Sequence, residues 1–221
     1  MSRTHLLFDL DQTLMASNSS GGAAMSRAFE QVPGAAGAFD ELNYQGRTDL
    51  WIIRAVAERS GVAESTLMRA FRDDYPRLLR EEMSQRNPTA LPGVVALLEA
   101  LAARDEVVLG LGTGNWRETA FVKLGHIELD GYFETGGFGD RHDNRPDMLR
   151  EGVEALGWEP GERLVVIGDS EHDMTGAAAI GAVAVGVATG AWSQDELAAA
   201  GADVALPDLS DLDRAITALL A

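Results

Sequence analysis

The sequence predicts an α/β protein, with a doubly wound, Rossmann-like parallel sheet that is interrupted near its start by an inserted helical cap. Short apolar strands alternate with helices from about residue 89 to the end of the chain, and such alternation is typical of βαβ units. Between residues 15 and 88 the apolar periodicity is helical and predicts no strand. We therefore expect a core domain of residues 1–14 plus 89–221 and a helical cap domain of residues 15–88.

The first elements follow from local apolar patterns. Residues 4–10 (THLLFDL) are mostly apolar and predict a short buried strand. The inserted segment carries helical periodicity over residues 21–31, 48–60 and 63–85. Asn87-Pro88 and Pro92-Gly93 are turn signals that close the insertion.

The rest of the chain predicts the remaining parts of the sheet. Strands are expected at residues 106–112, 133–138, 163–168 and 183–188. Helices are expected at residues 93–104, 115–125, 146–157, 172–181 and near 210–220. Because the strands are apolar throughout, we expect helices to cover both faces of the sheet.

The composition excludes several classes of protein. The chain has 46% hydrophobic and 24% charged residues, as soluble globular domains do, and its lack of cysteine excludes disulfides, thiolate catalysis and cysteine-ligated zinc. A net charge of −17 disfavours nucleic acid and anionic membranes as partners. The sequence contains no apolar run long enough to span a membrane and no secretion signal, so we expect a cytoplasmic protein. No pattern specifies an oligomeric state.

Acidic residues follow two of the predicted strands at one edge of the sheet. Asp9 and Asp11 follow the first strand, and Asp169 and Asp173 follow the strand at 163–168. Open parallel sheets bind ligands at the carboxyl ends of their strands, and residues two apart in a strand point the same way. Carboxylates that converge repel one another, and a hard cation such as Mg²⁺ relieves that repulsion. One carboxylate can also attack phosphorus while another acts as general acid and base.

Four motifs favour this interpretation over the simpler one, in which Asp9 and Asp11 only form a turn. They are FDLDQTL (8–14), VVLGLGTGN (107–115), DNRPDML (143–149) and VVIGDSEHDM (165–174). In content, order and spacing they resemble the four motifs of the haloacid dehalogenase superfamily, in its phosphatase branch. The intervening segment resembles the helical cap of the phosphoglycolate phosphatase-like group, including GRTD at residues 46–49.

The resemblance implies a role for each matching residue. Asp9 would be the nucleophile that forms an aspartyl-phosphate, and Asp11 would be the general acid and base. The implied Mg²⁺ site consists of Asp9, Asp169, the backbone carbonyl of Asp11, and Asp173 in or next to the coordination shell. The implied phosphate-binding residues are Thr113, Gly114, Asn115 and Arg145. The substrate would be a small phosphorylated molecule.

Four residues depart from the family pattern or lie outside it. Arg145 stands where the family usually has lysine, and it keeps the charge and adds a bidentate fork. Lys123, the only lysine in the chain, is the rival for that role, but its apolar neighbours favour a surface lysine that snorkels. Gln12 replaces a frequent glycine and changes no reactive group. Arg47 in the cap is either a clamp on the substrate or a solvated residue.

Other functions share parts of this pattern. A phosphosugar mutase of the β-phosphoglucomutase type has all four motifs, and only the fate of its intermediate differs. Haloacid dehalogenases usually lack the second aspartate of the first motif, here Asp11, and non-catalytic phosphate-binding modules usually lose the nucleophile, here Asp9. Phosphonatases need a cap lysine, which residues 15–88 do not contain. The sequence thus favours a Mg²⁺-dependent phosphatase.

Overall fold

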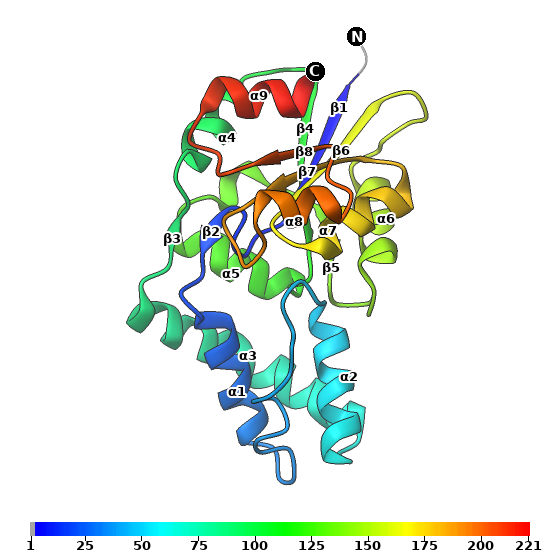
Figure 1. The fold of residues 1–221 in the computed structure, drawn as a ribbon. Helices are drawn as coiled ribbons and strands as arrows, with labels where there is room; N and C mark the ends of the chain where they lie inside the picture. Colours follow the sequence, from blue (N-terminus) through cyan, green and yellow to red (C-terminus); the bar gives the residue numbers. More distant parts are fainter. Residues whose placement is uncertain (1–2) are drawn as a thin grey trace.

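The computed structural model describes residues 3–221, which form a parallel sheet covered by helices and a separate group of helices at one end (Figure 1). Six parallel strands make up the sheet in the order β5-β4-β1-β6-β7-β8. Their bounds are Thr4–Phe8 (β1), Val107–Thr113 (β4), Gly136–Phe138 (β5), Arg163–Gly168 (β6), Val183–Val187 (β7) and Val204–Leu206 (β8). The predicted fold class is confirmed.

Side-chain alternation along β1 divides the apolar core into two layers. Leu6 and Phe8 belong to one buried cluster and Leu7 to the other, because successive side chains of a strand point to opposite faces. The first layer is closed by α4 (Val94–Ala102), α5 (Arg117–His126) and α9 (Leu212–Leu220). The second is closed by α6 (Arg145–Ala155), α7 (Glu171–Ile180) and α8 (Gln194–Ala199).

The inserted segment consists mainly of three helices, α1 (Ser20–Glu30), α2 (Asp49–Ser60) and α3 (Glu64–Arg86). Phe29 of α1 stacks on Phe71 of α3 with ring centroids 5.8 Å apart, and Phe71 meets the core residue Trp116 edge to face at 4.8 Å. The segment therefore shares one apolar cluster with the first layer of the core.

The sequence missed four short elements of regular structure, β2 (Met15–Ala16), β3 (Thr89–Ala90), α8 and β8, and one 3-10 turn, Asp130–Tyr132. The two-residue strand β2 lies in the stretch expected to contain none, and it pairs with β3 where the chain leaves and re-enters the core. The helix α8 and the strand β8 were also not predicted. Elements of two to six residues are too short for apolar periodicity to reveal them.

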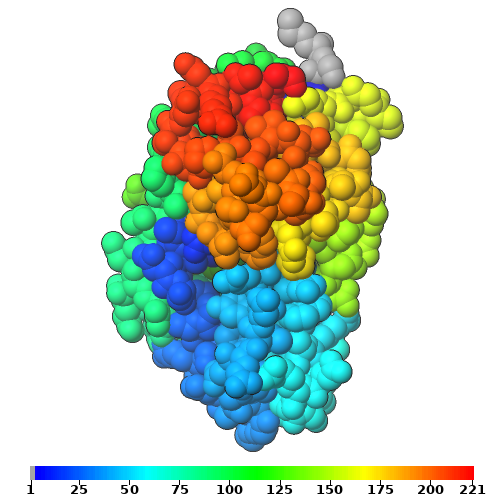
Figure 2. Space-filling view, in the orientation of Figure 1, coloured from blue at the N-terminus to red at the C-terminus, as the bar shows by residue number. Residues whose placement is uncertain are grey.

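The cap segment lies directly against the core (Figure 2). The backbone N–H of Asp49 donates to the carbonyl of Gly114 at 2.8 Å, and that of Leu50 donates to Gly139 at 3.2 Å. A Cβ on Gly114 would lie 2.3 Å from the carbonyl oxygen of Arg47, so only glycine permits this contact. No helix in residues 3–221 is both long and apolar enough to cross a membrane.

Candidate active site

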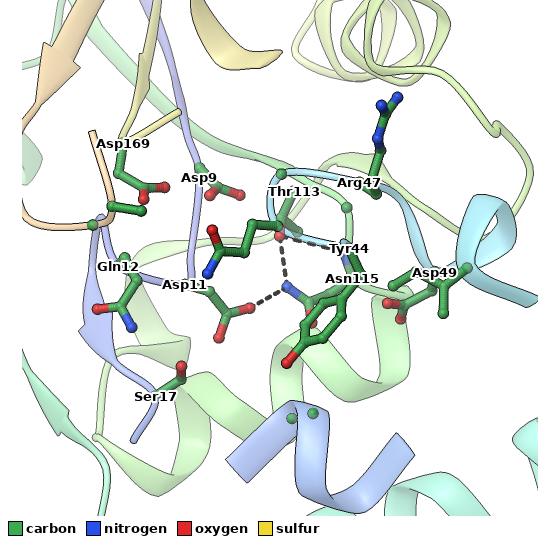
Figure 3. Close-up of a pocket in the computed structure, with 18 of the residues that line it drawn as sticks. Asp9, Asp11, Gln12, Ser17, Tyr44, Arg47, Asp49, Thr113, Asn115 and Asp169 are labelled. Carbon is green, nitrogen blue, oxygen red and sulfur yellow. Dashed lines mark hydrogen bonds between the residues drawn. The ribbon is translucent and has the colours of Figure 1, made fainter. Parts of the chain in front are cut away.

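Strand register brings the predicted site residues to one edge of the sheet. Phe8, at the end of β1, lies opposite Leu111 of β4 and Ile167 of β6. The residues that follow these strands therefore emerge side by side and line a cavity of about 320 Å³ between the core and the cap (Figure 3). Its lining includes Asp9, Asp11, Arg47, Thr113, Gly114, Asn115, Lys123, Arg145 and Asp169.

Three carboxylates on one side of the cavity form what we call the acidic cluster, Asp9, Asp169 and Asp173. All three are buried, and one oxygen from each lies within 4.8 Å of the others. Arg145, at the first position of α6, inserts its guanidinium beside them, with Nη2 2.9 Å from Asp9 Oδ1 and in contact with Asp173. The guanidinium therefore lies among the carboxylates of the first and fourth motifs.

The acidic cluster holds more negative charge than Arg145 balances. Burial raises the pKa of Asp9 to about 6 against the charge of Arg145, and Asp173 and Asp11 add to the rise. Burial, together with the charges of Asp173 and Asp9, raises the pKa of Asp169 to about 9. A hard divalent cation prefers carboxylate oxygen ligands and would relieve this repulsion. The donor set thus fits Mg²⁺.

The three acids of the cluster differ in how much of their binding capacity is free. Asp173 Oδ2 accepts hydrogen bonds from the backbone N–H (3.1 Å) and the hydroxyl (2.6 Å) of Ser170, while Oδ1 accepts from Arg145. Asp9 and Asp169 both line the cavity. Asp173 is therefore placed to fix Arg145 and the loop after β6, while Asp9 and Asp169 face the space where a cation and a phosphate would sit.

The other side of the cavity contains a second set of polar residues, Asp11, Asn115 and Lys123, which we call the balanced cluster. Lys123 is not a surface lysine, and that sequence interpretation was wrong. Its side chain is 3% exposed, and Nζ lies 2.5 Å from Asp11 Oδ2 and 2.7 Å from Asn115 Oδ1. The apolar neighbours of Lys123 in α5 pack into the core, and its own side chain extends from that helix into the cavity wall.

Asn115 connects this cluster to the second motif. Its Nδ2 donates to Asp11 Oδ2 and to Thr113 Oγ1, both at 2.8 Å (Figure 3). Burial raises the pKa of Asp11, but the charge and hydrogen bond of Lys123 and the amide of Asn115 outweigh it, so this pKa lies below its ordinary value. Asp9 and Asp11 thus take different partners although they are two residues apart. The backbone N–H of Asp9 still donates to Ile167 of β6 at 2.8 Å, whereas Asp11 lies past this last contact between β1 and β6.

Gln12 shows why the family often has glycine at its position. Its backbone has a φ of 60°, in the left-handed region that costs a non-glycine residue on the order of 1 kcal/mol. The hydroxyl of Thr189 donates to the Gln12 carbonyl and holds the turn. The side chain lies at the cavity, near Asp11 (Figure 3).

The cap places two charged residues at the cavity. The Arg47 guanidinium stacks over the ring of Trp51, 4.6 Å from its centroid, and points away from Asp11 (Figure 3). Asp49, which the sequence analysis did not single out, is 3% exposed, and its Oδ2 accepts from the backbone N–H of Trp116 at 2.9 Å. Burial raises the pKa of Asp49 to about 7. Its position in GRTD was the only signal for it in the sequence.

Comparisons with known proteins identify the family and the fold of the chain. A family model described as haloacid dehalogenase-like hydrolase matches residues 6–187. The phosphoglycolate phosphatase of Synechococcus elongatus is 27% identical over 97% of this chain and 98% of its own length. A hydrolase from Pseudomonas syringae has the same fold, with a TM-score of 0.76, 25% identity and coverage of 99% and 100% of the two chains. A β-phosphoglucomutase from Clostridium difficile, 15% identical, superposes with a TM-score of 0.73 over 96% and 93%.

Proposed function

Because the chain belongs to the haloacid dehalogenase-like hydrolase family, we propose that it is a Mg²⁺-dependent phosphatase that hydrolyses a small phosphorylated metabolite through an aspartyl-phosphate. The family and the phosphoglycolate phosphatase relative support a phosphoric monoester hydrolase. The observation that carries the proposal is the pairing of Asp9 with Arg145 on one side of the cavity and of Asp11 with Asn115 and Lys123 on the other.

Each residue contributes a distinct part of the reaction. Asp9 attacks phosphorus, while Arg145 and Thr113 bind the phosphoryl oxygens together with the backbone of Gly114 and Asn115. Asp11 gives a proton to the leaving-group oxygen and later takes one from the water that releases phosphate. Positioning and charge neutralisation supply most of the catalysis in phosphoryl transfer.

Asp9, Asp169 and the Asp11 carbonyl would hold Mg²⁺, with Asp173 beside them. When bound, the cation would supply neutralisation of phosphate charge. The cation fits the charge of the site, because three carboxylates face one arginine in the acidic cluster. The chain-specific feature is that Arg145 already contacts Asp9 and Asp173, two of the acids that would hold the cation or lie beside it.

Two alternatives are separated by what happens to the intermediate. A mutase must retain the phosphoryl group on the enzyme for a second transfer, whereas a phosphatase releases it to water. The likeness to β-phosphoglucomutase is below 25% identity and concerns the fold. The presence of Asp9 and Asp11 disfavours a phosphate-binding module and a dehalogenase, respectively. A cytoplasmic location remains a prediction.

The test is release of phosphate from p-nitrophenyl phosphate and from a panel of phosphorylated metabolites that includes phosphoglycolate. We expect turnover with Mg²⁺ and none in excess chelator. Conversion of one sugar phosphate into an isomer, with no phosphate released, would favour the mutase. Full activity in chelator would contradict the metal requirement.

Arg47 is proposed to contact the far end of the substrate. Arg47 lines the cavity, and its guanidinium rests on Trp51, so the proposed contact requires a change of rotamer. Arg47→Ala should lower kcat/KM about ten-fold or more for the natural substrate, because remote contacts help to position the reacting group. The same variant should cleave p-nitrophenyl phosphate almost normally. Equal losses on both substrates would instead assign Arg47 to folding or to the core site.

A further inference from the structure

The balanced cluster contains a buried cation, Lys123, that no step of the proposed reaction uses. It is the only lysine in the chain, and the other 17 of the 18 basic residues are arginine. The space around it is narrow, since a Cβ on Gly21 would lie 3.3 Å from Nζ. An ammonium is compact and donates in three directions, whereas a guanidinium is a planar fork. The site therefore favours a compact head group over a planar fork.

The contacts of Lys123 leave only one oxygen of Asp11 free. Asp11 Oδ2 accepts from Lys123 Nζ at 2.5 Å and from Asn115 Nδ2 at 2.8 Å. A carboxylate oxygen offers about two lone-pair sites, so both sites of Oδ2 are taken. The other oxygen lies on the side of Ser17, whose side chain also lowers the pKa of Asp11 through a hydrogen bond (Figure 3). It is the oxygen that Lys123 and Asn115 leave for proton transfer.

Lys123 also fixes the orientation of the Asn115 amide. Its Nζ donates to Asn115 Oδ1 at 2.7 Å, which turns Asn115 Nδ2 toward Asp11 and Thr113. Without the ammonium the amide is free to turn over, and its oxygen would then face the Asp11 carboxylate. The orientation of Asp11 thus depends on Lys123 both directly and through Asn115.

We propose that Lys123 is a positioning residue that holds Asp11 by Oδ2, so that Oδ1 alone is left for proton transfer with the phosphate ester. This rests on the proposed phosphatase function. In the first step Asp11 takes up a proton at Oδ1 as the anionic phosphate ester binds beside it. It gives that proton to the leaving-group oxygen while Asp9 bonds to phosphorus and the bond from phosphorus to the leaving group breaks. In the second step water bonds to phosphorus, its proton goes to Asp11 Oδ1, and the bond between Asp9 and phosphorus breaks.

The experiment compares two substrates in the Lys123→Met variant, which keeps a side chain of similar length without the ammonium. β-Glycerol phosphate has a poor leaving group that needs a proton, whereas p-nitrophenolate leaves without one. Because kcat/KM reports the steps up to loss of the leaving group, we expect it to fall about 10- to 100-fold for the glycerol ester and less than about three-fold for the nitrophenyl ester. The kcat for both should fall, since water attack is common to them.

Two further variants complete the test. Arg104→Met removes the same unit of charge from the surface, where Arg104 is 41% exposed, and should leave both substrates unaffected. Lys123→Arg keeps the buried charge but changes the donor directions, and it should lower the ratio of the two kcat/KM values in the same direction by a smaller factor. This variant decides the matter if Lys123→Met does not fold.

The outcomes separate the two proposals. Equal losses on the two esters, or no loss, in the folded Lys123 variants would overturn the positioning role and leave the phosphatase standing. Wild-type protein that hydrolyses neither ester with Mg²⁺, nor any phosphorylated metabolite in the panel, would overturn both. A selective loss on the glycerol ester supports both.

Discussion

The two sides of the cavity solve the problem of buried charge in opposite ways. The acidic cluster sets Asp9, Asp169 and Asp173 against a single guanidinium, and the pKa values of Asp9 and Asp169 are raised. The balanced cluster sets one carboxylate against one ammonium, and the pKa of Asp11 is lowered. The acidic cluster is therefore incomplete without a cation, whereas the balanced cluster is complete in the protein alone.

The largest expected effect comes from Asp9→Asn, which should abolish turnover because an amide does not attack phosphorus. Because the acidic cluster carries excess negative charge, the variant should be no less stable than the wild type at pH 8 in chelator. The folded pKa of Asp9 is about 6, above its unfolded value, so wild-type stability falls as pH rises toward 6 and that loss is complete at pH 8. Thermal unfolding measures this, and a clearly lower Tm would show that Asp9 stabilises the cluster.

Asp11→Asn should also lose activity, by roughly 10²- to 10⁴-fold for alkyl phosphates, but with the opposite effect on stability. It leaves the Lys123 ammonium, 3% exposed, without its anion. Removing one partner of a buried pair costs about 3–5 kcal/mol, and we expect the lower end of that range because the Asp11 side chain is 32% exposed. Denaturant unfolding of Asp9→Asn and Asp11→Asn under the same conditions tests this contrast. A change of the free energy of unfolding in the same direction for both variants would contradict it.

The same division explains what could be predicted from the sequence. Asp9 and Asp169 follow β1 and β6, so strand prediction alone brings them to one edge, and four ordered motifs identify the chemistry. Lys123 lies inside a helix, away from any strand end. Its partner Asp11 is 112 residues away in sequence, and no local pattern marks such a pair.

The cap shows the same limit. The three cap helices carry their own periodicity and were predicted, but β2 is two residues long and exists because it pairs with β3 across the insertion. Asp49 lies in the first turn of the helix predicted at residues 48–60. Only the docking of that helix on Trp116 buries its carboxylate. Features set by packing between distant segments were the ones missed.

Added Mg²⁺ should stabilise the protein through the acidic cluster, with a smaller effect than the two substitutions. The raised pKa values of Asp9 and Asp169 mean that a cation must displace protons from the acidic cluster. The Mg²⁺ concentration that gives half of the thermal stabilisation should therefore fall at least about ten-fold between pH 6 and pH 8.5. Asp169→Asn should lose most of the response, whereas Asp11→Asn should keep it. A response that is independent of pH would contradict the assignment.

The smallest expected effect concerns Asp49, a buried carboxylate that lies close enough to the balanced cluster to sense its charge. Lys123 lowers its pKa and Asp11 raises it, so the two oppose each other, and burial dominates in raising the pKa to about 7. Between about pH 4 and 7 the unfolded chain releases this proton before the folded protein does, so wild-type stability falls as pH rises through that window. An asparagine at this position has no charge to lose and can still accept from the N–H of Trp116.

Asp49→Asn should therefore gain Tm relative to the wild type as pH rises from 5 to 8, by about 2–4 °C for each kcal/mol recovered, with little further gain up to pH 8.5. Asp147→Asn is the matched control, because Asp147 is exposed and its pKa is lowered by its hydrogen bond to Asn144. Above pH 5 Asp147 is ionised in both the folded and the unfolded wild type, so the Tm difference between Asp147→Asn and the wild type should stay constant. If the Tm difference between Asp49→Asn and the wild type is equally independent of pH, Asp49 is charged in the folded protein. The balanced cluster then presents a net positive charge to Asp49 rather than no net charge.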